Sequence, residues 1–101
     1  MDTKRAELLL TELRDYLRKL NDEDLYIQTR NVSEAVQYLE QSDTEEEKEQ
    51  IIRTYFRYLY PARGGLSDVV IWDSDFATRV ALNEPLERIR KELTAIVRTR
   101  E

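Results

Sequence analysis

The chain contains no cysteine and no histidine among its 101 residues. Their absence excludes disulfides, thiolate nucleophiles, zinc sites of the Cys/His type, Ser-His-Asp triads and imidazole general bases. Only two glycines and two prolines are present, which argues against collagen, low-complexity disorder and a turn-rich β-sandwich. No apolar run approaches about 18 residues and no signal-peptide core is visible, so we expect a cytoplasmic protein that crosses no membrane.

Charge, by contrast, is abundant, because 37% of the residues are charged and 41% are hydrophobic. The length predicts one helical domain over residues 1–101. Residues 1–50 carry seven Lys/Arg and fourteen Asp/Glu, whereas residues 51–101 carry nine and seven. An acidic first half disfavours binding to duplex nucleic acid and suits a basic partner, although solubility alone would explain it more simply.

Apolar residues in the first part of the chain recur at helical spacing. They predict a first helix from Asp2 or Thr3 to Leu20. A second helix is expected to begin near Asp22 or later. Its apolar pattern is poor at first and then becomes regular, so we expect a bend or restart near Asn31.

A third helix is predicted after a polar connection, with Asp43 or Thr44 as its cap and three acidic residues, 45–47, in its first turn. This helix should end by Tyr60, because the α conformation is disfavoured in a residue that precedes a proline such as Pro61.

Residues 66–76 lose the helical period and predict an irregular apolar loop or a single turn tucked against the bundle. A short helix over 73–82, capped by its first or second residue, should follow. Asn83 is the expected cap of the last helix, with Pro85 in its first turn. The sequence therefore predicts an all-α fold, a compact bundle of four main helices with a short extra helix and an irregular Gly-Gly/Trp loop.

Both glycines, one proline and the single tryptophan gather within residues 60–73. A structural interpretation is that the glycines allow a turn and the Val-Ile-Trp segment plugs the end of the bundle. A functional interpretation is a rigid recognition loop in which an arginine binds a carboxylate or phosphate and the tryptophan is a buried anchor. The stretch matches neither a P-loop nor a dinucleotide-binding motif. The candidate residues of this loop are Arg63, Gly64, Gly65, Asp68, Trp72 and Asp73.

Two further clusters contain residue types that bind metal ions or nucleic acid. Asp68, Asp73 and Asp75 could supply oxygen ligands to a divalent cation, but their spacing fits no EF-hand loop, and capping and turn formation explain them more simply. A basic, aromatic patch for single-stranded nucleic acid is a further possibility, but pairing of its arginines with acidic residues of neighbouring helices is the simpler interpretation. The residues of this patch are Arg53, Arg57, Tyr60 and Arg63, with Tyr55 and Tyr58 between them. No catalytic residue, metal site or cofactor is therefore predicted.

Three strings resemble those of small bacterial toxin-immunity proteins: Tyr-Pro-Ala-Arg-Gly-Gly-Leu-Ser-Asp (60–68), Ile-Trp-Asp (71–73) and Leu-Asn-Glu-Pro-Leu (82–86). The resemblance implies a cytoplasmic non-enzyme that binds a cognate toxin domain and blocks its active site or a nearby surface. Many such toxins are basic nucleases, which an acidic face can attract by mimicking phosphates. The acidic candidates for this contact are Asp22, Glu23, Asp24, Glu40, Asp43, Glu45, Glu46 and Glu47.

Two other functions remain open at this point. One is a self-associating adaptor whose Tyr/Leu stripes form a homodimer. The other is a small enzyme or ligand-binding protein centred on Arg63 and Trp72.

Overall fold

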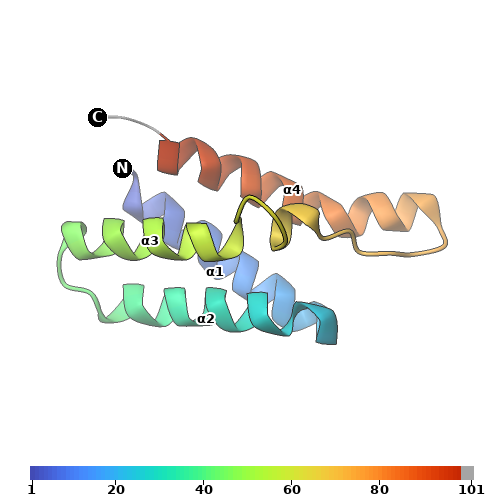
Figure 1. The fold of residues 1–101 in the computed structure, drawn as a ribbon, viewed down its shortest axis with the longest axis horizontal. Coiled ribbons are helices and arrows are strands. Elements are labelled where there is room, and N and C mark those ends of the chain that lie inside the picture. Colours follow the sequence, from blue (N-terminus) through green and yellow to red (C-terminus); the bar gives the residue numbers. More distant parts are fainter. Residues whose placement is uncertain (99–101) are drawn as a thin grey trace.

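The computed structural model describes residues 1–98. Its α-helices are α1 (Thr3–Leu20), α2 (Tyr26–Gln41), α3 (Glu45–Leu59) and α4 (Phe76–Arg98), with 3₁₀ turns η1 (Glu23–Leu25) and η2 (Leu66–Asp68). Helix α1 packs against each of the other three, and α2 also packs against α3 (Figure 1). No strand occurs within residues 1–98. The predicted all-α bundle is therefore confirmed.

The apolar stripes of the four helices meet in one hydrophobic core. Helix α1 is the largest contributor, which fits its central position. Burying a leucine side chain fully is worth about 1.5–3 kcal/mol, so these stripes are the main source of stability. The core side chains that are at most 1% exposed are Ala6, Leu9, Leu13, Leu17, Val32, Ala35, Val36, Leu39, Ile52, Leu59, Ile89 and Leu93.

The ends of α1 and α3 follow the predicted chemistry. The Asp2 carboxylate accepts a hydrogen bond from the Arg5 N–H at 3.0 Å, and α1 begins at the next residue. The Thr44 hydroxyl accepts from the Glu47 N–H at 3.2 Å, which identifies Thr44 as the cap of α3. Helix α3 ends at Leu59, so Tyr60, the residue before Pro61, is not part of the helix, as predicted.

The expected bend or restart near Asn31 is wrong, because α2 is continuous through this residue. The buried stripe of α2 begins only at Val32 and continues through Ala35, Val36 and Leu39. The pattern was poor because Tyr26 and Ile27 are 66% and 59% exposed. These two apolar residues face away from the core.

The expectation of two separate helices at the C-terminal end is also wrong, because α4 runs unbroken through Pro85. Proline has no N–H, so the carbonyl of Ala81 loses its usual helical partner. The Tyr16 hydroxyl donates to the neighbouring Leu82 carbonyl. This bond attaches α4 to α1 at the turn that Pro85 weakens.

The start of α4 lies later than predicted, and its cap is neither Asp73 nor Ser74. The Asp75 carboxylate accepts from the Thr78 N–H at 2.9 Å and from the Thr78 hydroxyl at 2.6 Å, directly before the first helical residue. These hydrogen bonds lower the pKa of Asp75.

The Asn83 side chain caps nothing. Instead it accepts from the Ile71 N–H and donates to the Ile71 carbonyl, both at 2.8 Å, and so ties the loop to α4.

No helix within the described part of the chain has both the length and the apolarity needed to span a bilayer.

Candidate functional site

The acidic candidates are all exposed, but they occupy two separate places. The first acidic cluster, Asp22–Asp24, lies between α1 and α2, and the second lies around the α2–α3 connection. The 16 residues of α2 separate them, which is about 24 Å at 1.5 Å per residue. Figure 1 shows these connections at opposite ends of α2. The members of the second acidic cluster are Glu40, Asp43, Glu45, Glu46 and Glu47.

Part of each cluster has a structural task. Asp22 caps η1 by accepting from the Asp24 N–H at 2.9 Å. The Glu45 carboxylate accepts from the Thr3 hydroxyl, and the Glu47 carboxylate accepts from the Ser42 hydroxyl at 3.2 Å. The carboxylates of the remaining members of the second cluster make no hydrogen bond or ion pair with any other residue of 1–98. These members are Glu40, Asp43 and Glu46.

A groove of about 430 Å³ lies between α2 and α3, directly beside the second acidic cluster. Of its lining residues in the described chain, Glu47 alone is charged. The acidic residues can be located from the sequence, but the groove cannot, because the groove depends on how two helices pair. The residues that line this α2–α3 groove are Tyr38, Gln41, Ser42, Glu47, Gln50, Ile51, Thr54 and Tyr55.

Tyrosine rings form one wall of the α2–α3 groove and continue beyond it. The Tyr55 ring lies 6.1 Å from the Tyr38 ring and 5.5 Å, edge to face, from the Tyr58 ring. The Tyr55 hydroxyl donates to the Glu34 carboxylate at 3.2 Å. Burial, helped by Glu34, raises the pKa of Tyr55 to about 12, so this hydroxyl stays protonated at neutral pH. The i, i+3 spacing of Tyr55 and Tyr58 was the one signal in the sequence.

Basic residues near the α2–α3 groove are already paired with neighbouring acids. Lys48 lies 3.5 Å from Glu7 of α1. Arg53 lies 3.1 Å from Glu49 and also donates to the Val97 carbonyl at 3.1 Å. Arg53 therefore joins α3 to α4. The negative potential of the second acidic cluster is left largely uncompensated.

The glycine-rich loop combines a structural role with an exposed tryptophan. Gly64 and Gly65 both have positive φ, at 70° and 88°, and the Gly64 N–H donates to the Asp68 carboxylate at 2.7 Å. Leu66 is 4% exposed and belongs to the core, and Val69 and Ile71 pack against it. Trp72 is 73% exposed, so it takes no part in closing the end of the bundle.

Arg63 and the three aspartates near the loop do not form one site. Arg63 is exposed and makes no ion pair with any other residue of 1–98. Asp73 accepts from the Asp75 N–H at 2.8 Å, so both of these residues, like Asp68, serve turns or a cap. In the part of the chain that the structure describes, no three acidic side chains converge to hold a metal ion.

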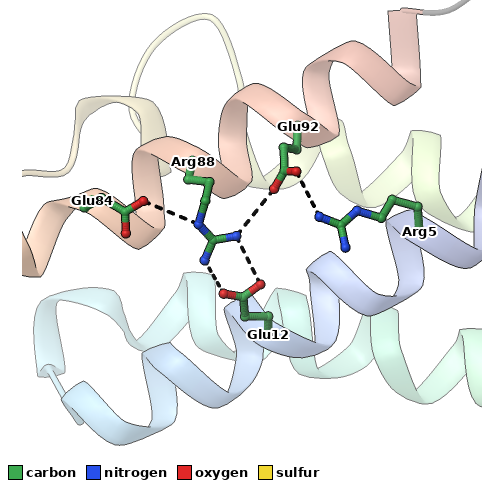
Figure 2. A network of polar contacts seen from close by, with 5 residues as sticks. All are labelled: Arg5, Glu12, Glu84, Arg88 and Glu92. Atoms are coloured by element: carbon green, nitrogen blue, oxygen red, sulfur yellow. Dashed lines mark hydrogen bonds and ion pairs between the residues drawn. The ribbon is translucent and has the colours of Figure 1, made fainter.

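A network of charges connects α1 to α4 (Figure 2). Arg88 hydrogen-bonds Glu12 of α1 and lies 3.4 Å from both Glu84 and Glu92. Glu92 also accepts from Arg5 at 2.9 Å. The bond to Glu12 raises the pKa of Arg88, and the bond from Arg5 lowers the pKa of Glu92. With two arginines and three glutamates the network carries one excess negative charge, and its ion pairs hold two helices together at the surface.

Comparisons with protein-family models, with curated proteins and with solved structures found no match. The surface that best combines free charge, aromatic rings and a cavity is the α2–α3 groove with the second acidic cluster. Carboxylates beside tyrosine faces suit a lysine or arginine side chain, because the ring face attracts a cation and the carboxylate pairs with it.

Proposed function

We propose that this chain is a non-enzymatic protein-binding module, an immunity protein of the cytoplasm that binds a cognate bacterial toxin domain. The α2–α3 groove receives basic side chains of the toxin, and the bound chain covers the toxin's active site or a surface beside it. The observation that carries the proposal is the groove itself, lined by Tyr38 and Tyr55 and carrying Glu47 as its charge.

The free carboxylates and the rings contribute differently to binding. Glu40, Asp43 and Glu46 act at long range and raise the association rate with a basic surface, an effect that salt weakens. The rings act at contact, because tyrosines are enriched at interfaces and a cation over a ring gains about 0.5–2 kcal/mol. Charge therefore governs how fast the toxin arrives, and the groove governs how long it stays.

The first acidic cluster lies outside the same interface. A standard interface covers roughly 800 Å² on each partner, which is a disc about 16 Å in radius. The two clusters lie about 24 Å apart along α2, so an interface centred on the α2–α3 groove ends before it reaches Glu23 and Asp24. Charges outside the contact area act on encounter more than on affinity.

The proposal is tested by searching the neighbouring genes for a toxin domain and measuring its binding to this chain after purification. The E40K/E46K variant should weaken binding by about 100-fold and flatten its dependence on salt, because two charge pairs become repulsions. The matched control E23K/D24K makes the same change of charge at the other end of α2. It should weaken binding by less than about 10-fold.

A second variant separates contact from charge. Y38A removes a ring that is 49% exposed and leaves every charge in place. It should speed dissociation while the slope of affinity against salt stays as in the wild type. Growth of cells that co-express the toxin should fall in the same order as the affinities. If E40K/E46K and Y38A both bind as tightly as the wild type, the α2–α3 groove is not the binding site. If the toxin domain does not bind at all, the immunity function is wrong.

A further inference from the structure

Four large apolar side chains are exposed together where the loop enters α4. Val70, Trp72, Phe76 and Val80 are 70%, 73%, 69% and 53% exposed. Phe76 and Val80 lie four residues apart on one side of the start of α4, and Arg79 lies over the rings of both Phe76 and the loop residue Trp72. We call these four residues the Trp72 surface. A cluster of this kind, unlike single exposed apolar residues, is typical of an interaction site.

The Trp72 surface is held rigidly by its own polar neighbours. The Arg79 guanidinium lies 4.3 Å from the centre of the Trp72 ring and 5.4 Å from that of Phe76. The Asn83 side chain holds the backbone of Ile71, the residue before the tryptophan, through two hydrogen bonds of 2.8 Å. A surface that is already ordered loses little conformational entropy when a partner covers it.

A groove of about 300 Å³ adjoins this surface between η2 and α4. Its apolar lining comes from Leu66, Val69, Val70, Val80 and Leu86. A volume of this order is at the lower end of pockets that hold small molecules, so it has room for one aromatic side chain. The groove thus lies beside a tryptophan that has no pocket of its own.

We propose that a second copy of this chain covers the Trp72 surface, in a two-fold dimer in which the N-terminal halves of α4 run antiparallel. With the two-fold axis between Phe76 and Val80, Phe76 of each copy meets Val80 of the other copy. Trp72 lies beside Arg79 of its own copy, and the same alignment sets this level of α4 against the first turn of α4 in the other copy. Each tryptophan is then covered by the second copy.

The charges of the Trp72 surface favour a copy of itself over a partner of one sign. Asp75 lies one residue before Phe76, and Arg79 lies one residue before Val80. In the antiparallel alignment Arg79 of one copy is offset by only about 3 Å along the axis from Asp75 of the other. The pair forms twice, because a two-fold interface repeats every contact.

The shape of the molecule also permits this arrangement. Figure 1 shows the N-terminal half of α4 extending beyond the ends of α1, α2 and α3, and the longest dimension of the molecule is 45 Å against 25 and 23 Å. Two projecting halves can pair while the bundles stay on opposite sides. The α2–α3 connection lies at the other end of the molecule (Figure 1), so the dimer leaves the second acidic cluster free.

The test uses the full chain and its single tryptophan as a probe. Sedimentation equilibrium from roughly micromolar to millimolar concentration should show the mass rising from 12.1 kDa to twice that value. The emission of Trp72 should shift to shorter wavelength, and its quenching by acrylamide should fall, over the same range of concentration. F76D should abolish all three changes. This variant keeps the helix, because an acidic residue is favourable in the first turn.

Two controls make the result specific to this surface. L8D introduces the same charge at a residue of α1 that is 59% exposed, and it should dimerise as the wild type does. V80E is a second variant of the surface and should behave as F76D, with unchanged far-ultraviolet circular dichroism in both. A monomer at every concentration, or a dimer that survives F76D and V80E, would overturn the proposal. So would protection of Trp72 only when the toxin domain is added, because the toxin would then be the occupant.

Discussion

Replacing Gly65 by alanine should destabilise the protein much more than replacing Gly64 by alanine. Both glycines have positive φ, but their surroundings differ. A Cβ on Gly64 meets no atom within 4 Å. A Cβ on Gly65 would lie 2.5 Å from Cδ of Pro61 and 2.8 Å from the Leu59 carbonyl oxygen. The two variants therefore separate the cost of the backbone conformation from the cost of the clash.

The magnitudes follow from these surroundings. For G64A the only cost is that of the left-handed backbone conformation, which is about 1–2 kcal/mol of stability. Gly65 has φ 88° and ψ −169°, a region that glycine almost exclusively occupies and that costs other residues about 1–3 kcal/mol. Overpacking against Pro61 and Leu59 adds about 1–3 kcal/mol. We expect a loss near 4 kcal/mol for G65A, or about 16 °C in Tm, against about 6 °C for G64A.

Thermal and urea unfolding of the wild type and both variants, followed by circular dichroism, measures these losses. The dependence of the unfolding free energy on urea should be the same for all three proteins, because the surface exposed on unfolding does not change. Equal losses for G64A and G65A would refute the reasoning, since the chain would then not pass so close to Gly65.

Two further predictions concern the loop and the tyrosine cluster. N83A removes both hydrogen bonds to Ile71, which should cost about 1–3 kcal/mol in urea unfolding and lower the fluorescence anisotropy of Trp72; an unchanged anisotropy would contradict the rigid loop. Because the pKa of Tyr55 is raised from 10.0 to about 12, its contribution to stability is fully present below pH 10 and is lost as the pH rises to 12. Unfolding measured across this range should show a smaller loss for Y55F than for the wild type, because Tyr16 and Tyr60, whose pKa values burial also raises, still contribute. E34Q should reduce the loss in part; a Y55F profile identical to that of the wild type would contradict the assignment.

The helices whose signals are local could be predicted from the sequence. The boundaries of α1 follow from Asp2 and from an apolar stripe without interruption. Those of α3 follow from Thr44 and from Pro61. In each case the residues that start or stop the helix act within one turn of it, so no knowledge of tertiary contacts is needed.

The errors arise where a distant residue decides the outcome. Pro85 is compatible both with the first turn of a helix and with a helix interior. The interior position is supported by the Tyr16 hydroxyl, which donates to the Leu82 carbonyl from 66 residues earlier in the chain. Asn83 has the side chain of a cap but uses it to hold Ile71, 12 residues earlier. The local pattern contains neither contact.

The candidate site was predicted in part for the same reason. The members of the second acidic cluster lie close together in sequence, and all of them are exposed, as expected of charged residues. The α2–α3 groove requires Tyr38 and Tyr55 to lie opposite each other, which only the pairing of two helices brings about. The exposure of Trp72 was not predicted, because tryptophan is usually well buried and nothing in the sequence marks this one as an exception.

The central position of α1 has a consequence for how the chain folds. Helix α1 is synthesised before the other three helices, yet its apolar side chains are covered in part by α4, which is synthesised after them. Until α4 arrives, α1 has contacts only with α2 and α3, which follow it directly in sequence. Such local contacts form fast, whereas closing the long loop between α1 and α4 is the slower step. The helical hairpin that carries the α2–α3 groove should therefore form early, and the bond of Arg88 to Glu12 should be among the last to form.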